Sequence, residues 1–571
     1  MSRIITSNIG DDALSEALAQ VTRALERAAG EIVAGESVAV AFEAPRNADF
    51  GDFATNVAFG LAKRARRAPQ TLAAELVERM FAVEPALRET LAEATPVAGF
   101  INVRFTPAVW RDVVAVILRA GDAYGSHVPT GTRISLEFGS ANPTGPLVVV
   151  QGRTLSLGDS LAKTMRFAGY DVTTEWIIND AGSQIEMLAR SLYARYRQIA
   201  DPNFAFPDDG YPAEYLIEMA QRLRARDGPR WDDVPEALWL PFFGAYGRDE
   251  IVHEQQEVCA KFEVAFDRWQ SEKTLHESGA IERGIAALRE RGLVFDQDGA
   301  VWMRATEFGD DKDRVIVRQD GRPTYYGADI AYHFDKLQRT DRAVLILGPD
   351  HHGYISRLEA IGDAFGRPGA IKAVIAQQMT LLRGGEVVSL SKRAGNVLTL
   401  DEIIDEVGVD AARFFFTLTN PDSPMTFDLS LAKERSIDNP VYYVQYGHAR
   451  IASIERRADP LLLERAERGE ALERLGEPSE LALARRLSEF PALVRSVAET
   501  YAPQRLTRYA QSVAADFHQF YMQCRVLGDD AELSVARLGL ARATKLVLAQ
   551  TLTLLGVSAP QSMPDLPDEP S

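Results

Sequence analysis

Three stretches of this sequence carry side chains whose types and spacing suit chemistry. Ser140–Leu147 reads SANPTGPL, a run of turn residues between two apolar segments. Ser391-Lys392-Arg393 lies in a glycine-containing loop, where a mobile lysine can neutralise charge that builds on a departing phosphate. Tyr325 and Asp329 are four residues apart, so on one helix face they would present a phenol and a carboxylate together.

The first of these stretches lies between a predicted strand and a predicted helix. Ile134, Leu136 and Phe138 alternate with polar residues, which is typical of a half-buried strand. Leu157, Leu161 and Met165 recur every four residues, as in a helix that packs on a sheet. Strand, turn and helix in this order predict the first crossover of a nucleotide-binding α/β domain, with phosphates at the helix N-terminus.

The rest of the sheet is predicted from further apolar runs. Residues 172–178 form a β-rich run that stops at Asn179-Asp180, where the carboxyl edge of a parallel sheet binds ligands. From about residue 290 the second half of the sheet is expected. The strand candidates there are the alternating run 314–318 and the apolar runs 343–348 and 373–376. Residues 200–265 are predicted to be an inserted helical region.

The sequence patterns before residue 128 and after about residue 430 differ from the pattern of the central sheet. Residues 1–128 predict a separate α+β unit, with helices at 13–29 and 57–66 and a strand at 99–105. From about 430 the pattern is all helical, with amphipathic helices near 479–500, 504–526 and 531–556. Residues 564–571 are rich in proline and aspartate and predict a disordered acidic tail.

Composition limits the classes of protein that are possible. The chain has 571 residues, enough for two to four domains, and 63 basic against 81 acidic residues give a net charge of −18. This acidity argues against indiscriminate binding to nucleic acid but leaves a specific complex possible. No signal peptide or membrane span is expected, and the two distant cysteines fit a reducing cytoplasm. No cysteine or histidine pattern predicts a bound metal.

Seven ordered motifs together resemble the class I arginine–tRNA ligases, over residues 49 to about 563. They are residues 47–52 (NADFGD), 137–147 (EFGSANPTGPL), 176–182 (WIINDAG), 323–333 (PTYYGADIAYH), 348–354 (GPDHHGY), 391–396 (SKRAGN) and 439–450 (NPVYYVQYGHAR). Several motifs in family order are far more specific than a single glycine loop.

This resemblance implies the fold, the reaction and the partners. It implies an N-terminal domain that contacts the tRNA elbow (1–128), a Rossmann-type parallel-sheet catalytic domain (129–428) and an all-α anticodon-binding domain (429–563). The expected reaction joins L-arginine to its tRNA through an arginyl-adenylate made from ATP with Mg²⁺, a first step that usually requires bound tRNA in this family. The expected protein is a cytoplasmic monomer.

The resemblance also implies roles for individual residues. For arginine they are Glu137, Asn142, Tyr325 and Asp329; for ATP, Gly145, Val148, Val150, Gln151, His352, Ser391 and Lys392; for catalysis, Lys392, Ser391 and Gln151; for tRNA, Gln445, Tyr446 and Arg450. From the residues alone, Glu137 is equally compatible with a solvent-facing carboxylate, and Tyr446 with helix packing.

The chain departs from the family at its first ATP-binding signature. The family has His, an apolar residue, Gly and His where this chain has Val148, Val149, Val150 and Gln151. Both histidines donate to the phosphates in the transition state, and the glycine lets adenine approach the backbone. Gln151 can still donate from its amide, whereas Val148 cannot. In the second signature Ser389 replaces the first basic residue.

Three functions are therefore compatible with the sequence. The first is an arginine–tRNA ligase that tolerates the altered signature. The second is a non-catalytic paralogue that binds arginine or tRNA, and the third is a transferase that uses the same pocket for another amino group. The retained residues of the arginine side favour a pocket that still binds a ligand, and the resemblance favours the ligase.

Overall fold

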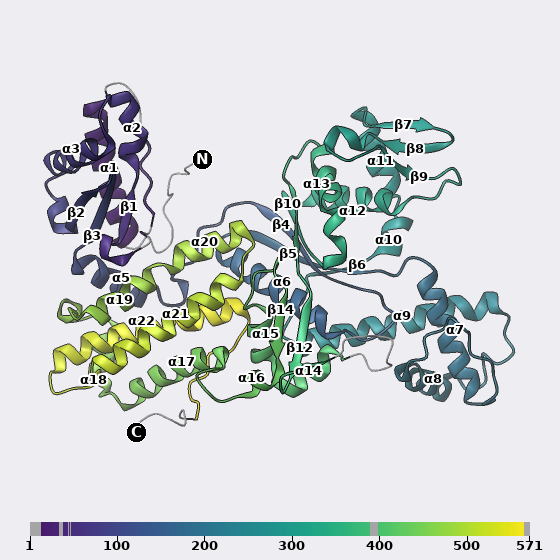
Figure 1. Cartoon of the computed structure of the whole chain (residues 1–571). Helices are drawn as coiled ribbons and strands as arrows, with labels where there is room; N and C mark the ends of the chain where they lie inside the picture. The colour runs from purple at the N-terminus through teal and green to yellow at the C-terminus, as the bar shows by residue number, and fades with distance from the viewer. Residues whose placement is uncertain (1–12, 34–37, 44, 46, 389–397, 565–571) are drawn as a thin grey trace.

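The structure is a computed structural model, and it describes residues 13–33, 38–43, 45, 47–388 and 398–564. Figure 1 shows a small N-terminal unit, a central sheet with helices around it, and a long helical bundle near the C-terminus. The N-terminal unit lies against this bundle, where Arg485 pairs with Asp52 at 2.7 Å. The first and last parts of the chain therefore meet.

The N-terminal unit is a three-stranded antiparallel sheet with helices on it. Its elements are α1 (Ala13–Ile32), η1 (Ala48–Phe50), β1 (Phe53–Thr55), α2 (Val57–Ala65), α3 (Pro69–Val83), α4 (Leu87–Thr90), β2 (Leu91–Val97), β3 (Phe100–Phe105), α5 (Pro107–Ala120) and η2 (Gly121–Ala123). The strands pair in the order β1-β3-β2, and α1 turns Val21 and Leu25 into the core. The predicted helices and strand of this unit are confirmed apart from small differences at their ends.

The central sheet has five parallel strands. They are β4 (Arg133–Ala141), β5 (Asp171–Ile178), β6 (Arg268–Ser271), β10 (Arg342–Leu347) and β11 (Ile371–Ile375), in the order β11-β10-β4-β5-β6. Counted along the chain this order is 3-2-1-4-5, the doubly wound arrangement, so the Rossmann-type fold is confirmed. The order reverses between β4 and β10, and ligands bind at the carboxyl edge beside such a switch point.

One strand predicted for this sheet belongs to another. The run 314–318 forms β9 (Arg314–Val317), which pairs antiparallel with β8 (Ala300–Met303) in a separate sheet of order β7-β8-β9, with β7 at Val294–Gln297. The prediction is wrong here because alternating polar and apolar residues are typical of an antiparallel sheet with one solvated face, whereas buried parallel strands are apolar throughout. Helices α10 (Glu272–Glu277), α11 (Ala280–Glu290) and η3 (Ala305–Phe308) accompany this sheet.

Helices lie before or after these strands in the chain, and most of them pack on the sheet. They are α6 (Val149–Phe167) after β4, α7 (Ser183–Gln198) after β5, α12 (Tyr325–Arg339) before β10, and η4 (Pro349–Tyr354) with α13 (Ile355–Ala364) after β10. Helix α6 approaches β4 closely because residue 158 is glycine: a Cβ there would lie 1.9 Å from Cγ of Phe138. This contact fixes the helix whose first turn follows the SANPTGPL turn.

Replacing Gly158 by alanine is expected to destabilise the fold by about 1–3 kcal/mol, because the added methyl group overpacks a closed contact. Gly30, a helical glycine of α1 where an added Cβ would have no neighbour within 4 Å, is the matched control. Gly30→Ala is expected to be neutral or stabilising by up to about 1 kcal/mol. Urea unfolding of both variants measures this difference, and equal midpoints would contradict it.

The region predicted as a helical insertion contains two helices and has its own core. Its helices are α8 (Glu214–Asp227) and α9 (Glu236–Lys261), which pack on α7. Aromatic rings fill the space between them, with Tyr193 stacked on Trp239 at a centroid distance of 3.9 Å. In Figure 1 this unit projects from the sheet on the side away from the C-terminal bundle.

A small second sheet connects the central sheet to the C-terminal bundle. It consists of β12 (Met379–Arg383), β13 (Glu386–Val388) and β14 (Met425–Asp428), with α14 (Leu400–Val407), α15 (Val409–Phe416) and α16 (Leu429–Lys433). The bundle comprises α17 (Pro440–Arg457), α18 (Pro460–Glu467), η6 (Leu472–Arg474), α19 (Pro478–Ser488), α20 (Phe490–Thr500), α21 (Gln504–Gln523) and α22 (Ala531–Leu555). The all-helical prediction is confirmed.

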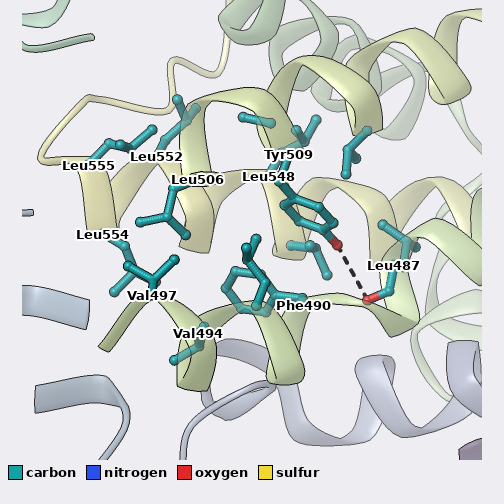
Figure 2. Packing of buried hydrophobic residues seen from close by; sticks show 14 of the residues in the cluster. Leu487, Phe490, Val494, Val497, Leu506, Tyr509, Leu548, Leu552, Leu554 and Leu555 are labelled. Carbon is teal, nitrogen blue, oxygen red and sulfur yellow. Dashed lines mark hydrogen bonds between the residues drawn. The ribbon is translucent and has the colours of Figure 1, made fainter. Parts of the chain in front are cut away.

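One predicted helix of the bundle is divided in two, and another is long and apolar. The predicted helix 479–500 is two helices, because Pro491 stands at the start of α20 and ends the preceding helix. Helix α22 is long and apolar enough to cross a membrane, but 67% of its apolar window is buried inside the protein. Figure 2 shows this core, in which Tyr509 points its hydroxyl toward the carbonyl oxygen of Leu487 at 3.4 Å.

Candidate active site

The SANPTGPL turn lies at the switch point of the sheet. Strand β4 ends at Ala141 and α6 begins at Val149, so residues 142–148 cross the carboxyl edge. Asn142 is exposed, and its Oδ1 accepts a hydrogen bond from Nδ2 of Asn179 at 3.3 Å. This bond leaves the Asn142 amide as a donor that faces the open edge. The prediction of an active-site turn here is consistent with the sheet order.

Glu137 lies beneath this turn in a buried network. The Oε2 atom of Glu137 accepts hydrogen bonds from the hydroxyl of Tyr332, at 2.9 Å, and from Nζ of Lys336. Lys336 is completely buried, and its ammonium also lies 3.7 Å from Glu175. Glu137 is therefore held by an internal cation and is not the solvent-facing carboxylate that alternation alone allows.

The second carboxylate of the network is fully paired. Burial alone would raise the pKa of Glu175, but Lys336 and Arg339 together hold it at about 2. Arg339 contacts both carboxylate oxygens of Glu175. Lys336 and Arg339 thus neutralise these two carboxylates below the sheet edge, with Asp335 as a further partner of Arg339, and this charge pattern fixes the position of Glu137.

Asp329 is a further carboxylate of this site, and the described residues provide it with no cationic partner. Its Oδ2 accepts a hydrogen bond from the hydroxyl of Tyr354 at 2.6 Å, and no lysine or arginine of the described residues forms an ion pair with it. Burial raises the pKa of Asp329 to about 6, with smaller contributions from the negative charges of Glu137 and Glu272. An uncompensated, partly protonated carboxylate next to Glu137 suits a cationic ligand.

Sequence patterns do not identify two groups of this site, Tyr354 and Glu272. The structure confirms the helix that carries Tyr325 and Asp329, but the Tyr325 side chain is 84% exposed and Tyr354 occupies the place beside Asp329. Tyr354 and Glu272 come from η4 and α10, far from α12 in the chain, so no local spacing could have linked them. Tyr325 stays a prediction as an arginine contact.

The first turn of α6 is closed by Gln151. Its Oε1 accepts the backbone N–H of Val148 at 2.8 Å, and its Nε2 lies 3.5 Å from the carbonyl oxygen of Ser140. Gln151 thus caps the helix end, as glutamine does at the third helical position. Val150 is 42% exposed beside it, whereas Val149 is buried. The Gln151 amide remains a donor, and Val148 and Val150 present apolar groups to the edge.

The turn is joined to the segment that follows the second signature. The backbone N–H of Val149 donates to Leu398 at 3.2 Å, and the N–H of Leu400 donates to Leu147 at 2.9 Å. Ser391 and Lys392 themselves lie outside the described residues. His352 is described: it is exposed on η4, the short helix that also carries Tyr354.

The predicted tRNA contacts of α17 are largely buried by the end of the chain. Gln445 donates from Nε2 to Asp410 at 2.7 Å and to the carbonyl of Ser558 at 3.0 Å. Tyr446 packs against Tyr442 and Met563 and accepts a bond from Arg450 at 2.9 Å. Arg450 also lies 4.4 Å over the ring of Tyr521.

A pocket of about 550 Å³ opens beside this cluster. Its walls include Gln445, Tyr442, Asp410, Lys433 and Arg435, whereas Tyr446 and Arg450 do not line it. Polar, basic and aromatic groups on one concave surface are what an unstacked base and its phosphate need. Within the described part of the chain no group of three or more histidine, cysteine or acidic side chains could hold a metal ion.

Both the sequence and the fold of this chain match known proteins. The arginyl tRNA synthetase N terminal domain matches residues 12–105, the catalytic domain of class I (R) tRNA synthetases matches 248–440, and the DALR anticodon binding domain matches 444–563. The arginine–tRNA ligase of Syntrophotalea carbinolica is 43% identical over 532 residues, covering 91% of this chain and 94% of that protein. This chain belongs to the arginine–tRNA ligase family.

Other members of the arginine–tRNA ligase family agree in length and fold. The ligase of Moorella thermoacetica is 43% identical over 95% of this chain and 97% of its own. Arginyl-tRNA synthetase of Thermus thermophilus superposes with a TM-score of 0.73 over 95% of this chain and 100% of that one, at 23% identity, which supports the fold. The three domain matches leave residues 106–247 uncovered, the stretch that contains the altered signature.

Proposed function

We propose that this chain joins L-arginine to its tRNA through an arginyl-adenylate. An oxygen of the arginine carboxylate attacks the α-phosphorus of ATP and pyrophosphate leaves; a ribose hydroxyl of the tRNA terminus then displaces AMP. Membership of the arginine–tRNA ligase family supports this function, and none of these relatives favours the non-catalytic or repurposed alternatives.

The observation that carries the proposal is the pair of neighbouring carboxylates Asp329 and Glu137. Asp329 has no cationic partner among the described residues, whereas Lys336 fixes the position of Glu137. Tyrosine hydroxyls fix one oxygen of each carboxylate, and the second oxygen of each has no donor among the described residues. A guanidinium has five donors in a planar fork and bridges two such oxygens. Asn142 supplies an amide for the arginine carboxylate, and Tyr325 at the helix start would cover the bound side chain.

ATP is proposed to bind along the first turn of α6, with Mg²⁺ as its counter-ion. Gly145 and the apolar Val148 and Val150 line this path, and His352 would pack against the nucleotide. Lys392 and Ser391 would neutralise the departing pyrophosphate, and Gln151 would donate the one remaining side-chain hydrogen bond from the first signature. This arrangement supports slow adenylation, since one donor stands where the family has two.

The tRNA is proposed to contact both ends of the chain. The pocket beside Gln445 supports an anticodon contact, to which Tyr446 and Arg450 would contribute once the segment from Ser558 moves. On the N-terminal unit a groove of about 470 Å³ presents the exposed rings of Phe50 and Phe100, which suits an unstacked elbow base. In this proposal the N-terminal, catalytic and anticodon-binding domains meet near residues 128 and 428. We expect a monomer in the cytoplasm.

Incubation of the purified protein with arginine, ATP and arginine tRNA tests the function. The predicted product is arginyl-tRNA, formed only with all three substrates present. Lysine in place of arginine is the matched control, because its compact ammonium lacks the planar fork of five donors that a guanidinium offers. Binding of arginine or tRNA without any product would instead support the non-catalytic alternative.

The arginine site predicts a pH dependence. Burial raises the pKa of Asp329 to about 6, and only the ionised carboxylate attracts a guanidinium, so kcat/KM for arginine is expected to fall about tenfold per pH unit below 6. His333 adjoins Asp329, but burial lowers its pKa to about 3, and it stays neutral over this range. Steady-state rates between pH 5 and 8 measure the profile, and a flat profile would contradict it.

A further inference from the structure

The carbonyl groups of the SANPTGPL turn are held by side chains from outside the sheet. Among the described residues, no backbone N–H donates to the carbonyls of residues 142–146. A turn whose carbonyls lack backbone partners depends on side-chain donors or water for its shape. The inserted helical region supplies two such donors.

The first donor is Tyr215 of α8. Its hydroxyl donates to the carbonyl oxygen of Thr144, and its ring lies beside Gly145, where a Cβ would be in ordinary van der Waals contact with it, 3.4 Å from the same hydroxyl. Burial raises the pKa of Tyr215, so the phenol stays protonated and remains a donor at every physiological pH.

The second donor is Gln255 of α9. Its Nε2 donates to the carbonyl of Gly145 at 3.0 Å and lies 3.4 Å from the carbonyl of Asn142. The side chain is almost fully buried, and its Oε1 has no partner among the described residues. A buried amide with an unsatisfied oxygen is costly, so its donor contacts must compensate for it.

We infer that Tyr215 and Gln255 are positioning residues for adenylation, which makes the inserted helical region a working part of the active site. This inference rests on the proposed function. The two side chains hold residues 142–145 between the arginine side and the ATP side, so that Asn142 and the first turn of α6 keep their relative positions. Neither residue touches the reacting atoms.

Tyr215→Phe tests this with little change of shape, because it removes only the hydroxyl. Arginine-dependent pyrophosphate exchange is expected to lose about tenfold in kcat/KM, with a higher KM for arginine and an unchanged Kd for tRNA. Tyr193→Phe is the matched control: it also removes a buried phenol that donates to a carbonyl, that of Trp231 at 3.1 Å, but from α7, on which the inserted helices pack, and away from the turn. Gln255→Met, which keeps the side-chain length, should behave as Tyr215→Phe does.

Hydrogen exchange of a peptide covering residues 141–149 gives a readout that does not need activity. Its amides should exchange faster in Tyr215→Phe and Gln255→Met than in wild type and in Tyr193→Phe. Equal exchange in all four proteins, or equal losses of kcat/KM in Tyr215→Phe and Tyr193→Phe, would overturn the inference. A wild-type protein that never activates arginine would overturn the proposed function instead, and the exchange measurement would then decide the inference alone.

Discussion

Replacing Asp329 by asparagine is expected to lower kcat/KM for arginine at least about 30-fold at pH 7.5. The variant keeps the shape of the side chain and the partner of Tyr354 but removes the charge that a guanidinium needs. Loss of one partner of a buried charge pair costs about 2–5 kcal/mol, which corresponds to factors between about 30 and 5,000. Initial rates of arginine-dependent pyrophosphate exchange measure the effect.

The same helix offers a control for this prediction. Asp335 lies on α12 but is partly exposed, where it pairs with Arg339 at 3.2 Å. Asp335→Asn removes the same charge from the same helix and is expected to change kcat/KM less than about threefold, as for a surface ion pair. Asp329→Asn should also abolish the fall in rate below pH 6. An Asp329→Asn protein with normal kcat/KM would exclude this carboxylate from the arginine site.

Restoring the family's first signature is expected to have the opposite effect. The combined variant Val148→His, Val150→Gly and Gln151→His places two donors and an uncovered backbone at the start of α6. Each transition-state donor contributes about 2.7–4 kcal/mol when well placed, so the exchange rate should rise at least about 100-fold even with imperfect geometry. Val150 is 42% exposed, so its removal leaves no internal cavity. Loss of the Gln151 cap costs about 1 kcal/mol of stability.

A triple variant without new donors separates the effect of hydrogen-bond donors from the effect of steric access. Val148→Ala, Val150→Gly and Gln151→Ala clears the same positions and is expected to show no gain in rate. If both triple variants activate arginine at the wild-type rate while thermal unfolding shows them folded, the three positions do not limit adenylation. Equal gains in both would assign the effect to steric access for the nucleotide and not to hydrogen-bond donors.

The strands of the sheet can be predicted from the sequence because the signal for each strand lies within its own residues. Runs such as 343–348 are apolar throughout, which only a strand buried on both faces needs, and β10 is found there. The alternating run 314–318 carries the signal of an antiparallel strand, and β9 accordingly lies outside the parallel sheet. Pro491 similarly marks the break between α19 and α20 that the helical stripe alone conceals.

The site is less predictable because its contacts are long-range. Asp329 and Glu137 follow from motifs, but Lys336 and Tyr354 acquire their roles only when α12 folds against β4 and η4 folds against α12. Tyr215 and Gln255 reach the turn from an insertion whose composition shows only a helical, aromatic core. Local spacing does not connect residues this far apart in the chain, so motifs find the site but not the groups that hold it in place.

The proposed function requires a site whose arginine side is intact and whose ATP side works with one side-chain donor, Gln151, where the family has two. Pyrophosphate exchange by the wild-type protein with arginine and tRNA present decides this, compared with the same reaction containing citrulline, a neutral analogue of similar shape. The predicted result is slow exchange that requires both arginine and tRNA and is absent with citrulline. No exchange with arginine, or equal exchange with citrulline, would contradict the proposal.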